Sequence, residues 1–171
     1  MTAPHVLIAY ASRNRGTAEI ADWIGLTLTA EGVPADVRAA ADIQDLCGYT
    51  AVVLGSGLYA GRWLRDATRF ARGHRVALRA VPVWLFSSGP LDSSAAERDI
   101  PPVNGVVKVA DELDAVEHAT FGGRLVPGAH GLVARMILSR GRGGDFRDRA
   151  QVRAWARRIA ATAALERPQL I

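Results

Sequence analysis

The amino-acid sequence predicts an α/β fold: a three-layer sandwich in which helices cover both faces of a five-stranded parallel sheet of order 2-1-3-4-5. Short, continuous apolar runs alternate along the chain with segments whose apolar residues recur at helical spacing. Continuous apolarity is typical of strands buried on both faces, and alternation of strands with helices is typical of a parallel sheet. Five such strands, joined by right-handed crossovers, suit the order 2-1-3-4-5.

Each element has its own local signal. The first strand, residues 5–11, is a continuous apolar run, whereas residues 35–39 alternate as an edge strand would. We expect the first helix to begin with Thr17 as its N-cap and to end with Gly32 as its C′ residue. The other strands are expected at residues 51–57, 81–87 and 115–125, and the other helical segments at residues 42–49, 63–71, 106–113, 132–138 and 152–163.

Length and composition are ordinary for a globular protein. The 171 residues are 49% hydrophobic and 22% charged, so we expect one domain spanning residues 1–171. No apolar run is long enough to cross a bilayer, and no secretory leader precedes the first strand, so we expect a cytoplasmic protein. The only cysteine, Cys47, has no partner for an internal disulfide and no neighbouring metal ligands, so we expect no metal site and a place for Cys47 in the core.

The charge is basic and carried almost entirely by arginine. The net charge is +4, and Lys108 is the only lysine among the 21 basic residues. Such a balance favours anionic partners, including phosphates and acidic membrane surfaces. No zinc-finger, RNA-recognition or helix-turn-helix signature is present, so we do not expect a nucleic acid as partner. Peripheral contact with an anionic membrane stays open, because arginines are frequent in the last third of the chain.

Three loops follow the first, third and fourth predicted strands. The carboxyl ends of parallel strands meet at one edge of the sheet, where such folds bind ligands. The candidate binding residues are Ser12, Arg13, Asn14, Arg15, Gly16 and Thr17 in the first loop, Ser56, Gly57, Leu58, Tyr59, Ala60 and Gly61 in the second, and Ser87, Ser88, Gly89 and Asp92 in the third.

The three loops differ in chemistry. The first combines hydroxyl and amide side chains with a helix N-terminus, which suits a phosphate monoester. In the second, glycines allow close approach to a flat ring on which Tyr59 could stack. The third offers small polar residues for the polar edge of that ring. No GxGxxG or GxxxxGK motif competes with this interpretation, although each loop taken alone could be an ordinary turn or helix cap.

The segment from Val6 to Ala21 resembles the opening of flavodoxins, whose phosphate loop reads Ser/Thr-x-Thr-Gly-x-Thr. Ser12 and Thr17 match its ends, while Asn14 replaces the middle threonine and Arg15 stands where glycine is usual. The runs 55–61, 121–125 and 136–145 are most similar to flavodoxin-like protoporphyrinogen dehydrogenases, which pass electrons to menaquinone.

This resemblance implies a flavodoxin-like fold, FMN as cofactor and an oxidoreductase that dehydrogenates a porphyrinogen-type or other small substrate with a quinone as acceptor. Two alternatives stay open: a flavodoxin-type electron carrier for a redox partner protein, and a flavin-free interaction module. No catalytic acid, base or nucleophile is assigned. Of the histidines only His130 follows the last strand near the expected flavin edge, and we expect it to lie on the surface.

Overall fold

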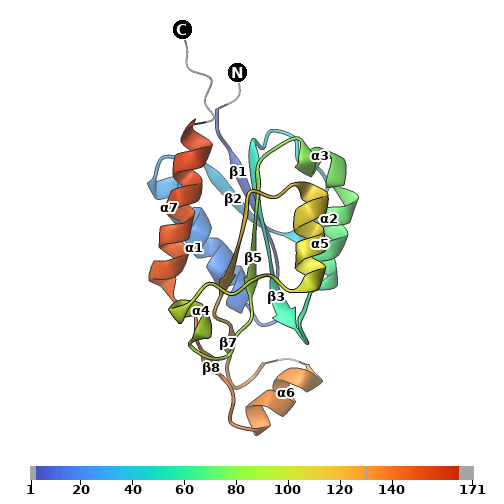
Figure 1. The fold of residues 1–171 in the computed structure, drawn as a ribbon, viewed down its shortest axis with the longest axis vertical. Coiled ribbons are helices and arrows are strands. Elements are labelled where there is room, and N and C mark those ends of the chain that lie inside the picture. The colour runs from blue at the N-terminus through green and yellow to red at the C-terminus, as the bar shows by residue number, and fades with distance from the viewer. Residues whose placement is uncertain (1–2, 130, 166–171) are drawn as a thin grey trace.

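The computed structural model describes residues 3–129 and 131–165, and its centre is a parallel sheet (Figure 1). The order across the sheet is β2-β1-β3-β5-β6, and every neighbouring pair in this order is parallel. The predicted fold class and strand order are therefore confirmed. The strands are β1 (Val6–Ala11), β2 (Ala35–Ala39), β3 (Ala51–Tyr59), β5 (Val83–Ser88) and β6 (Glu117–Phe121).

Helices cover both faces of this sheet (Figure 1). Strand β1 shows why the apolar runs are continuous: Val6 and Ile8 pack into one layer, and Leu7 and Ala9 into the other. All four are fully buried, so neither face needs polar residues. One layer holds α1 (Gly16–Ala30) and α7 (Arg149–Leu165), and the other holds α2 (Arg65–Gly73), α3 (Arg75–Arg79) and α5 (Asn104–Leu113).

Helix α1 begins differently from the prediction. Its N-cap is Arg15, in the left-handed conformation with φ 63°, and Thr17 lies buried in the first turn. The expected N-cap was therefore wrong, because the backbone turns into the helix two residues earlier. At the other end Gly32 has φ 81°, as expected for a left-handed residue just beyond the helix.

A hairpin replaces the predicted loop at residues 58–61. Strand β3 continues to Tyr59 and pairs antiparallel with β4 (Arg62–Trp63), so the predicted helix begins only at Arg65. The two turn residues, Ala60 and Gly61, have φ values of 50° and 71°. Two successive positive φ angles are typical of a type I′ turn, whose twist matches that of the flanking strands.

The connection from β2 to β3 was also predicted wrongly. A 3-10 helix, η1 (Ala40–Asp42), is followed by irregular chain instead of a helix over residues 42–49. The Asp45 carboxylate accepts a hydrogen bond from the Cys47 main-chain N–H at 2.9 Å. Local side-chain bonds of this kind compete with helix formation. They leave Cys47 exposed, contrary to the expected place in the core.

The predicted last strand divides in two. Strand β6 ends at Phe121, and β7 (Arg124–Leu125) pairs antiparallel with β8 (Gly144–Asp145). The break lies at Gly122, where a side chain would collide with the main chain of Phe146. Helix α6 (Leu132–Ser139) connects β7 to β8, and we call residues 124–129 and 131–145 the α6 unit. Figure 1 shows this unit beyond the carboxyl ends of the sheet strands.

A further short helix, α4 (Ser94–Glu97), interrupts the predicted loop at residues 88–102.

Candidate functional site

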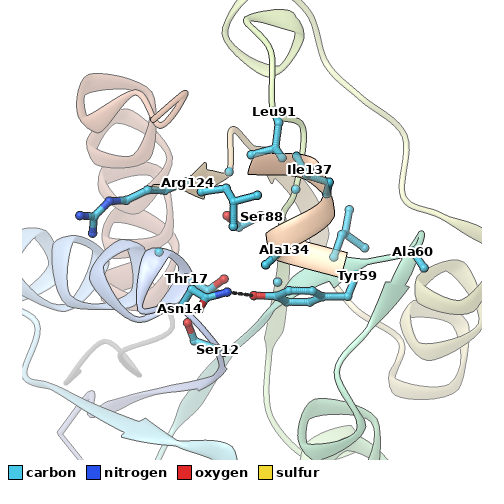
Figure 2. Close-up of a pocket in the computed structure, with 16 residues that line it drawn as sticks. Ser12, Asn14, Thr17, Tyr59, Ala60, Ser88, Leu91, Arg124, Ala134 and Ile137 are labelled. Carbon is cyan, nitrogen blue, oxygen red and sulfur yellow. Dashed lines mark hydrogen bonds between the residues drawn. The ribbon is translucent and has the colours of Figure 1, made fainter. Parts of the chain in front are cut away.

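A cavity opens at the carboxyl ends of β1, β3 and β5, where the three predicted loops meet (Figure 2). Its volume is about 90 Å³, below the roughly 300–1,000 Å³ of pockets that enclose a drug-sized ligand. The predicted residues that line it are Ser12, Asn14, Gly16, Thr17, Gly57, Leu58, Tyr59, Ala60, Ser88 and Gly89. The structure therefore brings all three loops to one site.

The first loop gives this cavity a polar wall. Ser12, Asn14 and Thr17 lie together on one side of it (Figure 2). Gly16 and Thr17 open helix α1, whose first N–H groups have no intrahelical acceptor and carry the positive end of the helix dipole. Hydroxyl, amide and backbone donors thus converge where an anion would be stabilised.

Two predicted arginines lie outside the cavity lining. Arg13 and Arg15 are both exposed, and the Arg13 guanidinium lies over the ring of Tyr59, with its carbon 5.2 Å from the ring centroid. Their charge can act on an anion in the first loop at a distance, but only Arg13 also touches the second loop.

Tyr59 links the second loop to the first. Its hydroxyl accepts a hydrogen bond from Asn14 Nδ2 at 3.5 Å, so the aromatic ring forms one side of the cavity (Figure 2).

Ser56 does not reach the cavity: its hydroxyl is buried, accepts from the Leu64 N–H and donates to the Gly57 carbonyl. Ser56 therefore stabilises the hairpin, and Gly61 is one of the two residues of the hairpin turn.

The third loop contributes Ser88 and Gly89 but not Ser87 or Asp92. Ser87 points to the other face of the sheet, where its hydroxyl accepts a hydrogen bond from Trp63 Nε1 at 2.8 Å. Asp92 is exposed and accepts hydrogen bonds from Ser94, which lower the pKa of its carboxyl. Asp92 therefore starts α4 rather than reaching into the cavity.

One wall of the cavity escaped prediction, because it comes mainly from the α6 unit. Ala134 and Ile137 stand one helical turn apart on the inner face of α6 (Figure 2). Arg124 lines the cavity, while its guanidinium turns away from it. The apolar stripe of α6 was visible in the sequence, but its partner was not. The lining residues that prediction missed are Leu91, Gly123, Arg124, Leu125, Ala134 and Ile137.

A buried arginine fixes the α6 unit to helix α1. The side chain of Arg147 is only 5% exposed, and it bonds Glu19 and Asp145 at 2.8 Å each. Its Nη1 also donates to the carbonyl oxygen of Gly16 at 3.2 Å. Hydrogen bonding from Arg147 lowers the pKa of Asp145, which keeps this carboxylate charged. The network therefore joins β8 to the start of the polar wall.

A half-buried histidine lies behind the third loop. His118 Nε2 is 2.9 Å from the Ser87 hydroxyl, and its Nδ1 is buried without a hydrogen-bond partner among the described residues. Burial lowers the pKa of His118 to about 4. This imidazole is therefore neutral at physiological pH, and it does not line the cavity.

The cavity offers few groups for proton transfer. Of the described residues that line it, none is Asp, Glu, His or Cys. The described parts of the chain contain no group of three or more such residues able to hold a metal ion. His130, which we expected on the surface near this site, lies outside the described residues. The site thus suits binding of a ligand that brings its own chemistry.

Comparison with known proteins gives this site its context. A family profile described as a flavodoxin domain matches residues 7–140. The chain belongs to the flavodoxin family. Membership implies FMN as its cofactor, and the polar and aromatic walls of the cavity fit a phosphate and a flat ring. No curated protein sequence matches this flavodoxin-family chain significantly.

Solved flavodoxins share its fold at low sequence identity. Oxidised flavodoxin 2 from Bacillus cereus is 21% identical, with TM-score 0.60 over 95% of this chain and 99% of its own. A flavodoxin mutant from Pseudomonas aeruginosa is 15% identical, with TM-score 0.63 over 94% and 99%. Rubredoxin oxygen:oxidoreductase from Desulfovibrio gigas is 13% identical, with TM-score 0.64 over 96% of this chain. The match covers only 37% of that enzyme, so the likeness concerns one part of it.

Proposed function

We propose that this flavodoxin-family protein is an FMN-dependent oxidoreductase that takes electrons from a porphyrinogen-type or other small substrate and delivers them to a quinone. The observation that carries the proposal is a cavity with anion-binding donors at one wall and apolar α6 residues at another. Bound FMN supplies the electron-transfer chemistry. The chain's own residues bind, orient and shelter it.

Each wall has a separate task. The N–H groups that open α1, with Ser12 and Thr17, hold the phosphate. The hairpin presents Tyr59 to the ring, while the Ser56 hydroxyl fixes the hairpin to the following chain. Ala134 and Ile137 exclude water and give an apolar surface on which a flat, apolar acceptor can rest. Because the described lining has no Asp, Glu, His or Cys, protons released by the substrate and taken up by the quinone must be exchanged with solvent.

A second candidate function is electron transfer to a partner protein. It is favoured by exposed Arg13 and Arg15 beside the polar wall and by the net charge of +4, which would attract an acidic partner. In this case the apolar surface of α6 would not need to meet a small acceptor.

The test uses purified protein saturated with FMN. Flavin absorbance retained on desalting establishes binding, and a colourless protein would contradict the whole proposal. Anaerobic reoxidation of the reduced protein by a soluble naphthoquinone is then followed at the flavin band. We expect Ile137→Asn to slow reoxidation several-fold, because Ile137 lines the cavity.

Met136→Asn is the matched control, since Met136 is a half-exposed neighbour outside the lining. Equal rates for both variants and the wild type would show that the quinone does not use this wall. Electron transfer to a partner protein would then be the better function. Adding protoporphyrinogen to the oxidised protein under anaerobic conditions tests the electron donor: flavin reduction supports the porphyrinogen substrate, and its absence removes it.

A further inference from the structure

The outer face of α6 carries exposed apolar side chains. Leu132 is 83% exposed and Met136 is 50% exposed. They stand four residues apart and so lie on one side of the helix. Ala134 and Ile137 line the cavity from the same helix. Helix α6 therefore has an inner apolar face toward the ligand site and an outer apolar face toward solvent.

The charge around this outer face is uniformly positive. The sequence has no Asp or Glu between Glu117 and Asp145, whereas Arg135, Arg140 and Arg142 fall in or just after α6. All three arginines are exposed. Within the described parts of the chain, none of the three forms an ion pair.

Helix α7 is also rich in arginine, but part of its charge is compensated. Arg157 pairs with Glu31 at 3.2 Å, and Arg158 pairs with Glu117 at 2.9 Å. The arginine-rich last third of the chain is thus not one basic surface. Three arginines without ion pairs among the described residues and two exposed apolar residues come together at α6, which projects beyond the sheet at one end of the molecule (Figure 1).

We propose that the outer face of α6 docks on an anionic lipid bilayer. Leu132 and Met136 enter the headgroup boundary, and the three arginines contact lipid phosphates around them. An acidic protein would satisfy the arginines equally well. The bilayer is favoured because two isolated apolar side chains on a projecting helix can enter lipid without a matching pocket. The value of docking for a lipid-soluble quinone rests on the proposed function, but lipid binding itself does not require it.

Such an anchor is weak and reversible. Only two apolar side chains insert, and the attraction of the arginines is screened by salt. In the described residues no helix is both long and apolar enough to span a membrane. The contact is therefore one at the membrane surface, and it would hold the cavity that α6 lines close to the lipid.

The test is sedimentation of the FMN-saturated protein with vesicles of phosphatidylcholine alone or mixed with phosphatidylglycerol. We expect binding to the anionic vesicles at low salt, little binding to the neutral ones, and release at high salt. Flavin absorbance of the same samples shows, independently of vesicle binding, whether the protein is folded and holds its cofactor. A protein that retains FMN but binds no vesicles would overturn the docking proposal and leave the proposed function intact.

Two pairs of variants locate the contact. Leu132→Ser with Met136→Ser should weaken binding about tenfold or more, whereas Val76→Ser with Val107→Ser, two exposed apolar residues on other helices, should not. Arg135→Gln with Arg142→Gln should weaken it roughly tenfold, whereas Arg153→Gln with Arg157→Gln removes equal charge from α7 and should not. If a control double variant lost as much binding as its α6 counterpart, the assignment to α6 would be wrong. It would also be wrong if replacing Leu132 and Met136 left vesicle binding unchanged.

Discussion

Arg147 Nη1 donates a hydrogen bond to the main-chain oxygen of Gly16 at 3.2 Å, across 131 positions of the sequence. Gly16 is the first residue of α1 and lines the cavity. Glu19, one turn further along α1, pairs with the same guanidinium. The geometry of the polar wall thus depends on a residue that lies beyond β8.

Replacing this arginine tests that dependence. Arg147→Met should lower the free energy of unfolding by about 1–3 kcal/mol, because Glu19 and Asp145 lose their buried partner. It should also raise the Kd for FMN, because the start of α1 loses a tether. Urea unfolding and flavin-fluorescence titration measure the two effects. Arg157→Gln, which breaks only an exposed pair with Glu31, should change stability by less than about 0.5 kcal/mol and leave the Kd unchanged.

Arg15 adopts a backbone conformation that glycine adopts without strain. Its φ is 63°, at the position where the resembled phosphate loop has glycine. We expect Arg15→Gly to stabilise the FMN-free protein by about 1 kcal/mol, since the left-handed conformation is strained for residues with a Cβ. Arg13→Gly is the control, because Arg13 has no positive φ. Stabilisation by both substitutions, or by neither, in urea unfolding would contradict this account of the loop.

Tyr59 is expected to act through its ring more than through its hydroxyl. The hydrogen bond from Asn14 is long, at 3.5 Å, so Tyr59→Phe should leave FMN binding within about twofold. Tyr59→Ala removes a cavity wall and should raise the Kd for FMN roughly tenfold or more. Flavin-fluorescence titration distinguishes the two. Equal affinities for the alanine variant and the wild type would show that the ring does not contact the cofactor.

His118 should make stability depend on pH. Burial lowers its pKa in the folded protein to about 4, whereas in the unfolded chain the pKa is near its ordinary value of 6.5. As pH falls, His118 is therefore protonated in the unfolded state at a higher pH than in the folded state. The folded protein loses stability as pH falls from about 6.5 to about 4. We expect a loss on the order of 1–2 kcal/mol in urea unfolding across this window.

His118→Gln should remove this part of the pH dependence, while His74→Gln, which changes a histidine outside the Ser87 pair, should keep it. Carboxylates also titrate toward the acid end of the window. The contribution of His118 is therefore measured as the difference between the pH profiles of the two variants. Identical pH profiles for His118→Gln and the wild type would show that His118 is not held neutral by the fold.

Much of this protein was determined by local sequence. Continuous apolar runs predicted the central strands, because a strand covered on both faces has no polar side, and alternation predicted the edge strand at residues 35–39. The stripe of Val152, Ala156, Ile159 and Ala163 predicted α7 from helical spacing, because only one face of this helix is buried, in one layer. Loops after parallel strands must meet at one edge, so the place of the site was also predictable.

Which residues face the cavity was decided only by the tertiary structure. Where both faces of a strand are buried, alternation gives no sign of direction, so Ser56 and Ser87 could not be told from Ser88 in sequence. The inner wall of α6 and the contact from Arg147 to Gly16 join segments far apart in the chain. Their positions follow from packing and charge pairing among distant elements, which leave no periodic trace in the sequence around any one of them.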